Sequence, residues 1–287
     1  MKVNGKEERL RQLGSQVKLL VCDMDGTLLN PRKEVGADTL KALRKMKEAG
    51  KYYTICTGRI TPMVRYYIDL LEIEVPVITA NGAVIWEPLE EKILYEEELP
   101  GEELLELLEF CRKHDLDYSA LTMGTGYFSR NSRRISRFEQ YNSIAAENGN
   151  ELMQLEYFDD NHACICGQKV FKVLIYELEE GQLGIAKTFI NGRKHIGYTS
   201  SEPGLLDVAH RIVDKGYGIR KAAEFMNLKK TEICAVGDYF NDIPMLEEAV
   251  FPVAMENGCA EIKEKAHYVT GTNEANGIAD MIYKFII

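Results

Sequence analysis

The sequence lacks a long apolar run and an apolar leader. Within its 287 residues no stretch of about 18 or more uncharged apolar residues occurs, so we expect no membrane-spanning segment. Residues 1–16 are charged and polar, without the apolar stretch that a secretory signal requires. We therefore expect a cytoplasmic protein, in which these residues form a leader or a short helix.

Basic residues are also in short supply. The chain has 35 Lys and Arg against 45 Asp and Glu, a formal net charge of −10. This balance disfavours nucleic acid as a partner, because surplus Lys and Arg hold phosphate backbones. Small anions are still possible ligands where cations are supplied locally. Nothing in the sequence indicates an obligate protein partner, an internal repeat or a low-complexity tract.

Seven cysteines occur without an export signal, which indicates reduced thiols. Cys22, Cys56 and Cys234 each lie inside an apolar run, where cysteine behaves as a small hydrophobic residue. We expect these three side chains to be part of the core.

Short apolar runs that end in a polar residue dominate the organisation of the chain. They cover residues 17–23, 52–57, 76–81 and 232–238. Uninterrupted apolar runs predict strands covered on both faces, as in a parallel sheet. Helical patterns alternate with them, at 37–49, 61–71, 218–226 and 241–249. We predict an α/β fold with a doubly wound, mostly parallel, Rossmann-like sheet.

Residues from about 99 to 200 interrupt this alternation. They contain a helical pattern at 102–114, a basic stretch near Arg130 and a strand-like piece at 169–177. The length of the chain favours two domains. We therefore expect an inserted α+β cap at 99–200, with the core split into 1–98 and 201–287. A hairpin is predicted at the first junction, at 83–98.

Polar residues follow the predicted strands, namely Asp23, Thr57, Asn81 and Asp238. In open α/β sheets ligands bind at the carboxyl ends of strands, so the pattern proposes one site from four distant segments. For each residue alone a turn or cap role is the alternative, since Asp, Thr and Asn are common there.

The segment DMDGTL begins at Asp23. If the strand stays extended through its end, Asp23 and Asp25 project to the same side, and Gly26 then permits a sharp turn. Two carboxylates in one small space repel unless a cation or hydrogen-bond donors offset the repulsion. Oxygen ligands without a histidine nearby favour Mg²⁺ over zinc. Asp238 and Asp242 would add negative charge.

These segments resemble, in order and placement, the four motifs of the haloacid dehalogenase-like phosphatases. The matching segments are Asp23-Met24-Asp25-Gly26-Thr27, Thr57-Gly58-Arg59, Lys215-Gly216 and Gly237-Asp238-Tyr239-Phe240-Asn241-Asp242. Asn81-Gly82-Ala83 and Val253-Ala254-Met255-Glu256-Asn257 are similar to the Cof-type subgroup, which carries a large α+β cap. The resemblance covers nearly everything from Val17 onward.

The resemblance implies a Mg²⁺-dependent phosphatase that hydrolyses small phosphate monoesters, such as sugar, nucleotide-type or cofactor phosphates. It implies that Asp23 is the nucleophile that forms an aspartyl-phosphate, and that Asp25 is the general acid and base. The implied Mg²⁺ ligands are the Asp23 carboxylate, the Asp25 backbone carbonyl and Asp238. The implied phosphate-binding groups are Thr57, the Gly58 amide, Lys215 and Asn241, with Asp242, Arg59 and Asn81 in support.

The acidic residue at Asp25 argues against carbon–halogen cleavage, because family members with that activity lack an acid at this position. A phosphotransferase or mutase on the same scaffold is one alternative, in which a second hydroxyl replaces water as the acceptor. A non-catalytic sensor of phosphorylated ligands is another, although intact Asp23, Asp25, Lys215 and Asp238 argue against it. The sequence does not decide which ester is the physiological substrate.

In the predicted cap, one basic cluster consists of Arg130, Arg133, Arg134 and Arg137. The spacing of Arg130, Arg133 and, approximately, Arg137 would align them on one helical face, where they could bind a second phosphate or a carboxylate. A solvated face paired with glutamates is the alternative, since charge runs usually reflect exposure. His162, Cys164 and Cys166 lack the second cluster that a structural zinc site needs.

Overall fold

A computed structural model describes the backbone of residues 2–287 and the side chains of residues 5–287. Contacts within the chain define two compact units. The first contains the chain up to Thr57, Leu71–Leu94 and Asp214–Ile287, and the second contains Gly58–Leu70 and Tyr95–Val213. The predicted insertion at 99–200 lies inside the second unit, but so do residues 95–98 and 201–213, which were expected in the core. Gly58–Leu70, expected in the N-terminal part of the core, groups with the second unit.

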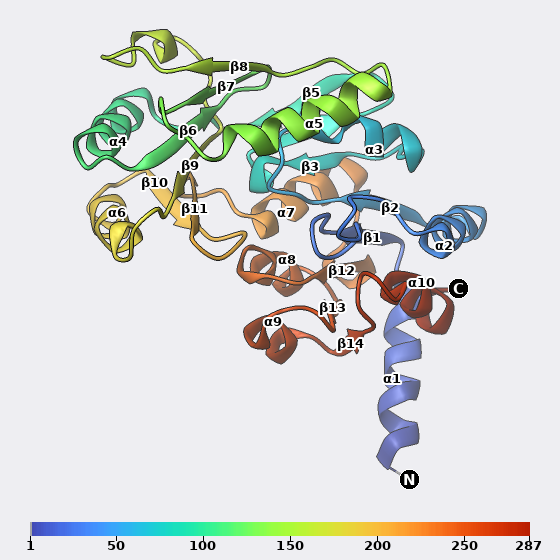
Figure 1. Ribbon diagram of the computed structural model, residues 1–287. Coiled ribbons are helices and arrows are strands. Elements are labelled where there is room, and N and C mark those ends of the chain that lie inside the picture. The colour runs from blue at the N-terminus through green and yellow to red at the C-terminus, as the bar shows by residue number, and fades with distance from the viewer. Residues whose placement is uncertain (1) are drawn as a thin grey trace. The chain divides into compact units, whose positions relative to one another are not determined.

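The first unit is built on a parallel sheet in the order β14-β13-β12-β1-β2. Its strands are β1 (Leu19–Cys22), β2 (Tyr52–Ile55), β12 (Ile233–Gly237), β13 (Phe251–Met255) and β14 (Tyr268–Thr270). Figure 1 shows the blue strands β1 and β2 in one sheet with the orange-to-red strands, so both ends of the chain build it. Every residue of β1, β12 and β13 is buried, as the apolar runs predicted for β1 and β12.

Helices of the first unit cover this sheet. α2 (Ala37–Glu48) packs on β2 through a buried stripe that includes Leu43 and Met46. α8 (Ile243–Glu247) packs on β12 and β13, and α9 (Ala260–Lys265) packs on β13. The remaining helices are α1 (Lys2–Gln16), α7 (Lys215–Met226), α10 (Gly277–Met281), the 3-10 turns η2 (Ala80–Gly82), η4 (Lys230–Glu232) and η5 (Phe240–Asp242), and the π-helical turn η6 (Ile282–Ile286).

One predicted strand is placed differently. We expected residues 76–81 in the parallel sheet, but β3 (Val77–Thr79) belongs to a small sheet with β4 (Val84–Glu87) and β5 (Lys92–Glu96). A single parallel bridge between Cys56 and Ile78 joins β3 to the end of β2. The predicted hairpin at 83–98 is confirmed as β4 and β5.

The second unit contains a sheet in the order β10-β11-β9-β6-β7-β8, antiparallel except between β7 and β8. Its strands are β6 (Asp117–Leu121), β7 (Thr125–Phe128), β8 (Gln154–Tyr157), β9 (Lys172–Tyr176), β10 (Ile196–Thr199) and β11 (Leu205–His210). Side chains of α4 (Gly101–Lys113) and α6 (Gln182–Asn191) form one apolar cluster with alternate side chains of the strands. The predicted α+β character of this part is confirmed.

Shorter elements complete the second unit. α5 (Ile135–Glu147) packs against α3 (Arg65–Leu70), which follows the 3-10 turn η1 (Thr61–Val64), and η3 covers Ala163–Ile165. The Phe138 ring of α5 lies edge-on to Phe128 of β7, with centroids 5.0 Å apart. In the described part of the chain, no helix has both the length and the hydropathy needed to cross a bilayer.

Candidate active site

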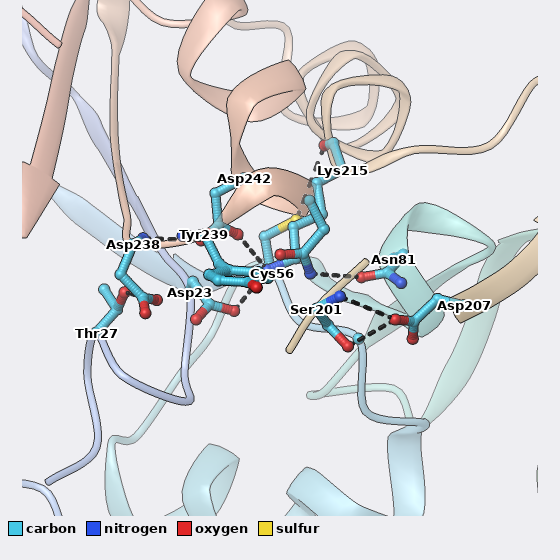
Figure 2. A network of polar contacts seen from close by, with 12 residues as sticks. Asp23, Thr27, Cys56, Asn81, Ser201, Asp207, Lys215, Asp238, Tyr239 and Asp242 are labelled. Atoms are coloured by element: carbon cyan, nitrogen blue, oxygen red, sulfur yellow. Dashed lines mark hydrogen bonds and ion pairs between the residues drawn. The ribbon is translucent and has the colours of Figure 1, made fainter. Parts of the chain in front are cut away.

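A buried ammonium group bridges two carboxylates in the first unit. Asp23 directly follows β1, and Lys215 is the first residue of α7. Lys215 Nζ lies 2.5 Å from Asp23 Oδ1 and 2.5 Å from Asp242 Oδ1. Figure 2 draws the three side chains within one network of polar contacts. The Lys215 side chain is 0% exposed, and those of Asp23 and Asp242 are 8% and 1% exposed. The structure therefore brings together three of the residues that the sequence proposed.

Burial and neighbouring charges shape the protonation of this cluster. Burial raises the pKa of Asp23 well above its ordinary value, and the Asp242 charge raises it further, while Lys215 opposes both. Burial lowers the pKa of Lys215, but the carboxylates of Asp23 and Asp242 outweigh burial and leave that pKa raised. Lys215 consequently stays charged at neutral pH.

Asp238 lies at the end of the neighbouring strand β12. Thr27 Oγ1 donates a hydrogen bond of 2.9 Å to Asp238 Oδ1. Burial, followed by the charge of Asp242, raises the pKa of Asp238 to about 7. Gly26 has a φ of +85°, and a Cβ added there would lie 2.4 Å from Asp238 Oδ2. The glycine of the DMDGT segment thus serves both the turn and the approach of Asp238.

Carboxylate oxygens of Asp23, Asp238 and Asp242 lie within 4.8 Å of one another. Asp242 is already fully engaged, because Oδ1 accepts from Lys215 and Oδ2 accepts from the amides of Asp238 and Tyr239 at 2.8 and 3.0 Å. Asp23 and Asp238 are therefore the carboxylates of this cluster that could hold a cation. A buried set of oxygen ligands with raised pKa values fits a hard divalent ion, which would offset the repulsion.

Asp25 is held by a second lysine that the sequence did not single out. Lys33 Nζ lies 2.6 Å from Asp25 Oδ1, with side chains 34% and 29% exposed. β1 ends at Cys22, so the strand does not continue through Asp25 as the same-side argument required. The carboxylates of Asp23 and Asp25 instead form ion pairs with two different lysines. Lys33 lies in a polar loop without periodic pattern, so no sequence signal identified it.

Asn81 and Asn241 also meet in the first unit. Asn241 Nδ2 donates a hydrogen bond of 3.2 Å to Asn81 Oδ1, and both side chains are buried. The Thr57 carbonyl accepts from the Asn81 amide at 2.9 Å, which ties the end of β2 to the end of β3. The strand-end residues Thr57 and Asn81 are thus neighbours, as the sequence predicted.

Arg59 belongs to the second unit. Its side chain is buried, with the guanidinium carbon 5.3 Å from the ring centroid of Tyr67 and 4.6 Å from that of Tyr141. Its contacts with these aromatic rings are cation–π interactions.

The predicted helical alignment of the arginine cluster is wrong, because α5 begins at Ile135 and leaves Arg130, Arg133 and Arg134 before it. Arg130 pairs with Asp160 at 2.8 Å. Arg134 and Arg137 both pair with Glu202, as the glutamate alternative proposed. Their side chains are only 13% and 32% exposed, so this part of the cluster is not a solvated face.

Comparisons with known proteins identify the family of the chain. The family model described as haloacid dehalogenase-like hydrolase matches residues 20–282. The chain is 26% identical to a 5-amino-6-(5-phospho-D-ribitylamino)uracil phosphatase of Bacillus subtilis, covering 93% of this chain and 97% of that protein. It is 27% identical to the pyridoxal phosphate phosphatase of Escherichia coli, covering 94% and 99%.

A solved structure of a haloacid dehalogenase-like hydrolase from B. subtilis superposes with a TM-score of 0.81 at 27% identity, covering 93% of this chain and 99% of that one. The matched family model, the curated relatives and the superposed structure therefore agree over most of the chain. The chain belongs to the haloacid dehalogenase-like hydrolases, as a Cof-type phosphoric monoester hydrolase.

Proposed function

We propose that the chain is a Mg²⁺-dependent phosphatase that hydrolyses small phosphate monoesters through an aspartyl-phosphate on Asp23. The observation that carries this proposal is the buried Asp23 carboxylate, 2.5 Å from the Lys215 ammonium and clustered with Asp238. The names of two relatives specify a ribitylaminouracil phosphate and pyridoxal phosphate, which supports sugar-like, nucleotide-type or cofactor phosphates as the substrate class. The cytoplasmic location stays a prediction.

The first step needs charge neutralisation, because a phosphate dianion repels an attacking carboxylate. Mg²⁺ held by Asp23, Asp238 and the Asp25 backbone carbonyl would neutralise charge on the nucleophile and on the phosphoryl oxygens. Lys215 contributes a fixed positive charge beside Asp23, and Asp242 holds that lysine in place. An oxygen of Asp23 attacks phosphorus, and the bond to the leaving oxygen breaks.

Asp25 acts as the general acid and then as the general base. It protonates the leaving alkoxide in the first step and accepts a proton from the hydrolytic water in the second, so one carboxyl acts in both directions. Thr57, the Gly58 amide and Asn241 hold the remaining phosphoryl oxygens. Water then attacks the phosphorus of the acyl phosphate, which releases inorganic phosphate and regenerates Asp23.

The test is the release of inorganic phosphate from an aryl phosphate and from a panel of sugar, nucleotide and cofactor phosphates, with Mg²⁺ and with a chelator. Asp23→Asn and Asp25→Ala are compared with Asp280→Asn, an exposed aspartate on α10. We expect Mg²⁺-dependent turnover that Asp23→Asn lowers by at least about a thousandfold. Full activity of Asp23→Asn would overturn the mechanism. An added alcohol tests whether phosphate is transferred instead of released.

A further inference from the structure

A buried ion pair in the second unit holds the residue that follows Thr57. Lys172 Nζ, on β9, donates a hydrogen bond of 2.9 Å to the carbonyl oxygen of Gly58. The same ammonium forms an ion pair with Asp207 on β11. The two side chains are 5% and 1% exposed. An ammonium buried this deeply depends on both partners, because an unpaired charge in the interior is strongly destabilising.

Strand alternation places this pair away from the apolar core of the second unit. Val173 and Val208 belong to the apolar cluster with α4 and α6. Lys172 precedes Val173 and Asp207 precedes Val208, so both charged side chains point to the opposite face of the sheet. Replacing a buried ion pair by apolar residues of similar volume commonly leaves the stability of a protein unchanged or raises it. Packing alone therefore does not account for charges at these two positions.

Asp207 also anchors the loop between β10 and β11. Its Oδ2 accepts hydrogen bonds from the backbone amide of Ser201 at 3.1 Å and from the Ser201 hydroxyl at 2.6 Å (Figure 2). Through Asp207 and Lys172, Ser201 is thereby connected to the Gly58 carbonyl.

The next residue of that loop is connected to Arg59. Glu202 pairs with Arg137 at 2.5 Å, and Arg137 Nε donates a hydrogen bond of 3.1 Å to the Tyr141 hydroxyl. The Tyr141 ring packs against the Arg59 guanidinium. Two adjacent loop residues are therefore each connected by a chain of contacts to one of the two residues that follow Thr57. Ser201 is connected to Gly58, and Glu202 is connected to Arg59.

We propose that Lys172 and Asp207 are positioning residues for phosphate binding, because they fix the backbone of Gly58. This inference rests on the proposed function, in which the Gly58 amide binds the transferring phosphoryl group. The hydrogen bond restrains the peptide plane that contains the Gly58 carbonyl. Because that plane and the plane of the Gly58 N–H share the Gly58 Cα, the restraint limits how the backbone can rotate at the residue whose N–H binds phosphate. Lys172 itself does not contact substrate. Its ammonium acts through the peptide backbone, and Asp207 holds the ammonium in place.

The test measures inhibition by inorganic phosphate together with kcat, KM and the thermal midpoint. The informative variant is Lys172→Met/Asp207→Asn, which removes both charges and leaves no unpaired ion in the interior. Lys169→Met is the control, since Lys169 lies on the same segment, is 60% exposed and pairs with Glu96 outside this network. Lys172→Arg is the conservative variant, because it keeps a hydrogen-bond donor for the Gly58 carbonyl and a positive charge for Asp207.

We expect the double variant to be folded and to have an inhibition constant for phosphate raised by about tenfold or more. The reason is that the variant loses the charged hydrogen bond to the Gly58 carbonyl, which restrains the phosphate-binding backbone. Lys169→Met should match the wild type, and Lys172→Arg should recover most of the loss. A folded double variant with the wild-type phosphate constant and kcat would overturn the inference, and so would a change confined to the thermal midpoint. Absence of turnover in the wild type would overturn the proposed function instead. In that case, calorimetric titration of the Mg²⁺-loaded protein with inorganic phosphate would measure the dissociation constant for phosphate. Comparing this constant between the wild type and the same variants would test the inference.

Discussion

Lys215 and Asp23 lie 192 residues apart in the chain, yet their charged atoms are 2.5 Å apart in the interior. Asp23 directly follows β1 and Lys215 begins α7, and Asp242 supplies a second carboxylate to the same ammonium. One lysine therefore forms ion pairs with two buried acids.

Replacing Lys215 tests how much this neutralisation contributes to folding. Lys215→Met leaves Asp23 and Asp242 buried without their cation, and we expect a loss of about 3–5 kcal/mol in the free energy of unfolding. Urea unfolding measures it. Lys221→Met, on the same helix but pairing with the exposed Glu224, is the control and should leave the midpoint unchanged. Equal midpoints for both variants would contradict the account of the buried bridge.

We expect the Asp238 carboxylate to lower the stability of the metal-free protein and to be required for Mg²⁺ binding. Burial and Asp242 disfavour its charge, so Asp238→Asn should raise the thermal midpoint of the metal-free protein at pH 8. Mg²⁺ at a hundredfold excess over its dissociation constant should stabilise the wild type by about 2.7 kcal/mol, and a chelator should remove that gain.

The same Asp238→Asn variant should gain nothing from Mg²⁺, whereas Asp280→Asn should respond like the wild type. Thermal unfolding with and without the ion gives both results. A wild-type response to Mg²⁺ in Asp238→Asn would show that this carboxylate is not a ligand.

A substitution at Gly26 tests the turn after Asp23, and the same substitution at Gly50 is its control. Both have positive φ, +85° and +74°, but a Cβ at Gly50 would meet nothing within 4 Å, whereas one at Gly26 would meet Asp238. Gly50→Ala should cost about 1 kcal/mol of backbone strain and keep full activity. Gly26→Ala should cost more and abolish Mg²⁺-dependent turnover, because it displaces Asp238. Similar activity in both variants would rule out the close approach as the reason for glycine at position 26.

His162 should make the second unit sensitive to acid. It is buried, its Nε2 lies 2.7 Å from the Tyr118 hydroxyl, and burial lowers its pKa below the ordinary value of 6.5, with Arg112 acting in the same direction and Glu109 and Asp159 opposing. The unfolded chain therefore takes up this proton first as pH falls. Stability is retained above about pH 6.5 and declines below it.

Thermal unfolding between pH 5 and 7.5 should show this decline in the wild type and in His267→Gln, whose histidine is exposed. His162→Gln should flatten the decline. An unchanged pH dependence in His162→Gln would assign the effect to other groups.

Much of the fold and part of the site follow from the sequence for a physical reason. Strands buried on both faces must be apolar throughout, so β1 and β12 are visible as continuous runs. Parallel strands end at one edge, which explains why Asp23 and Asp238 could be expected to meet. Lys215 was identifiable because a glycine and a helical pattern follow it.

Other features depend on contacts between distant segments that carry no periodic signal. The ion pair of Lys33 with Asp25 arises from a loop folding back, and polar loop residues show no pattern that names a partner. The grouping of Gly58–Leu70 with the second unit depends on long-range contacts such as Lys172 with Gly58. The spacing of Arg130, Arg133 and Arg137 fits a helix, but the chain is not helical before Ile135.

The stereochemical course at phosphorus tests the central claim most directly. Hydrolysis of an aryl phosphate made chiral with sulfur and oxygen isotopes reports whether phosphorus is attacked once or twice. Attack by Asp23 followed by attack of water inverts the configuration twice, so the account predicts net retention. Net inversion would mean that water attacks the ester directly, and it would contradict an aspartyl-phosphate on Asp23.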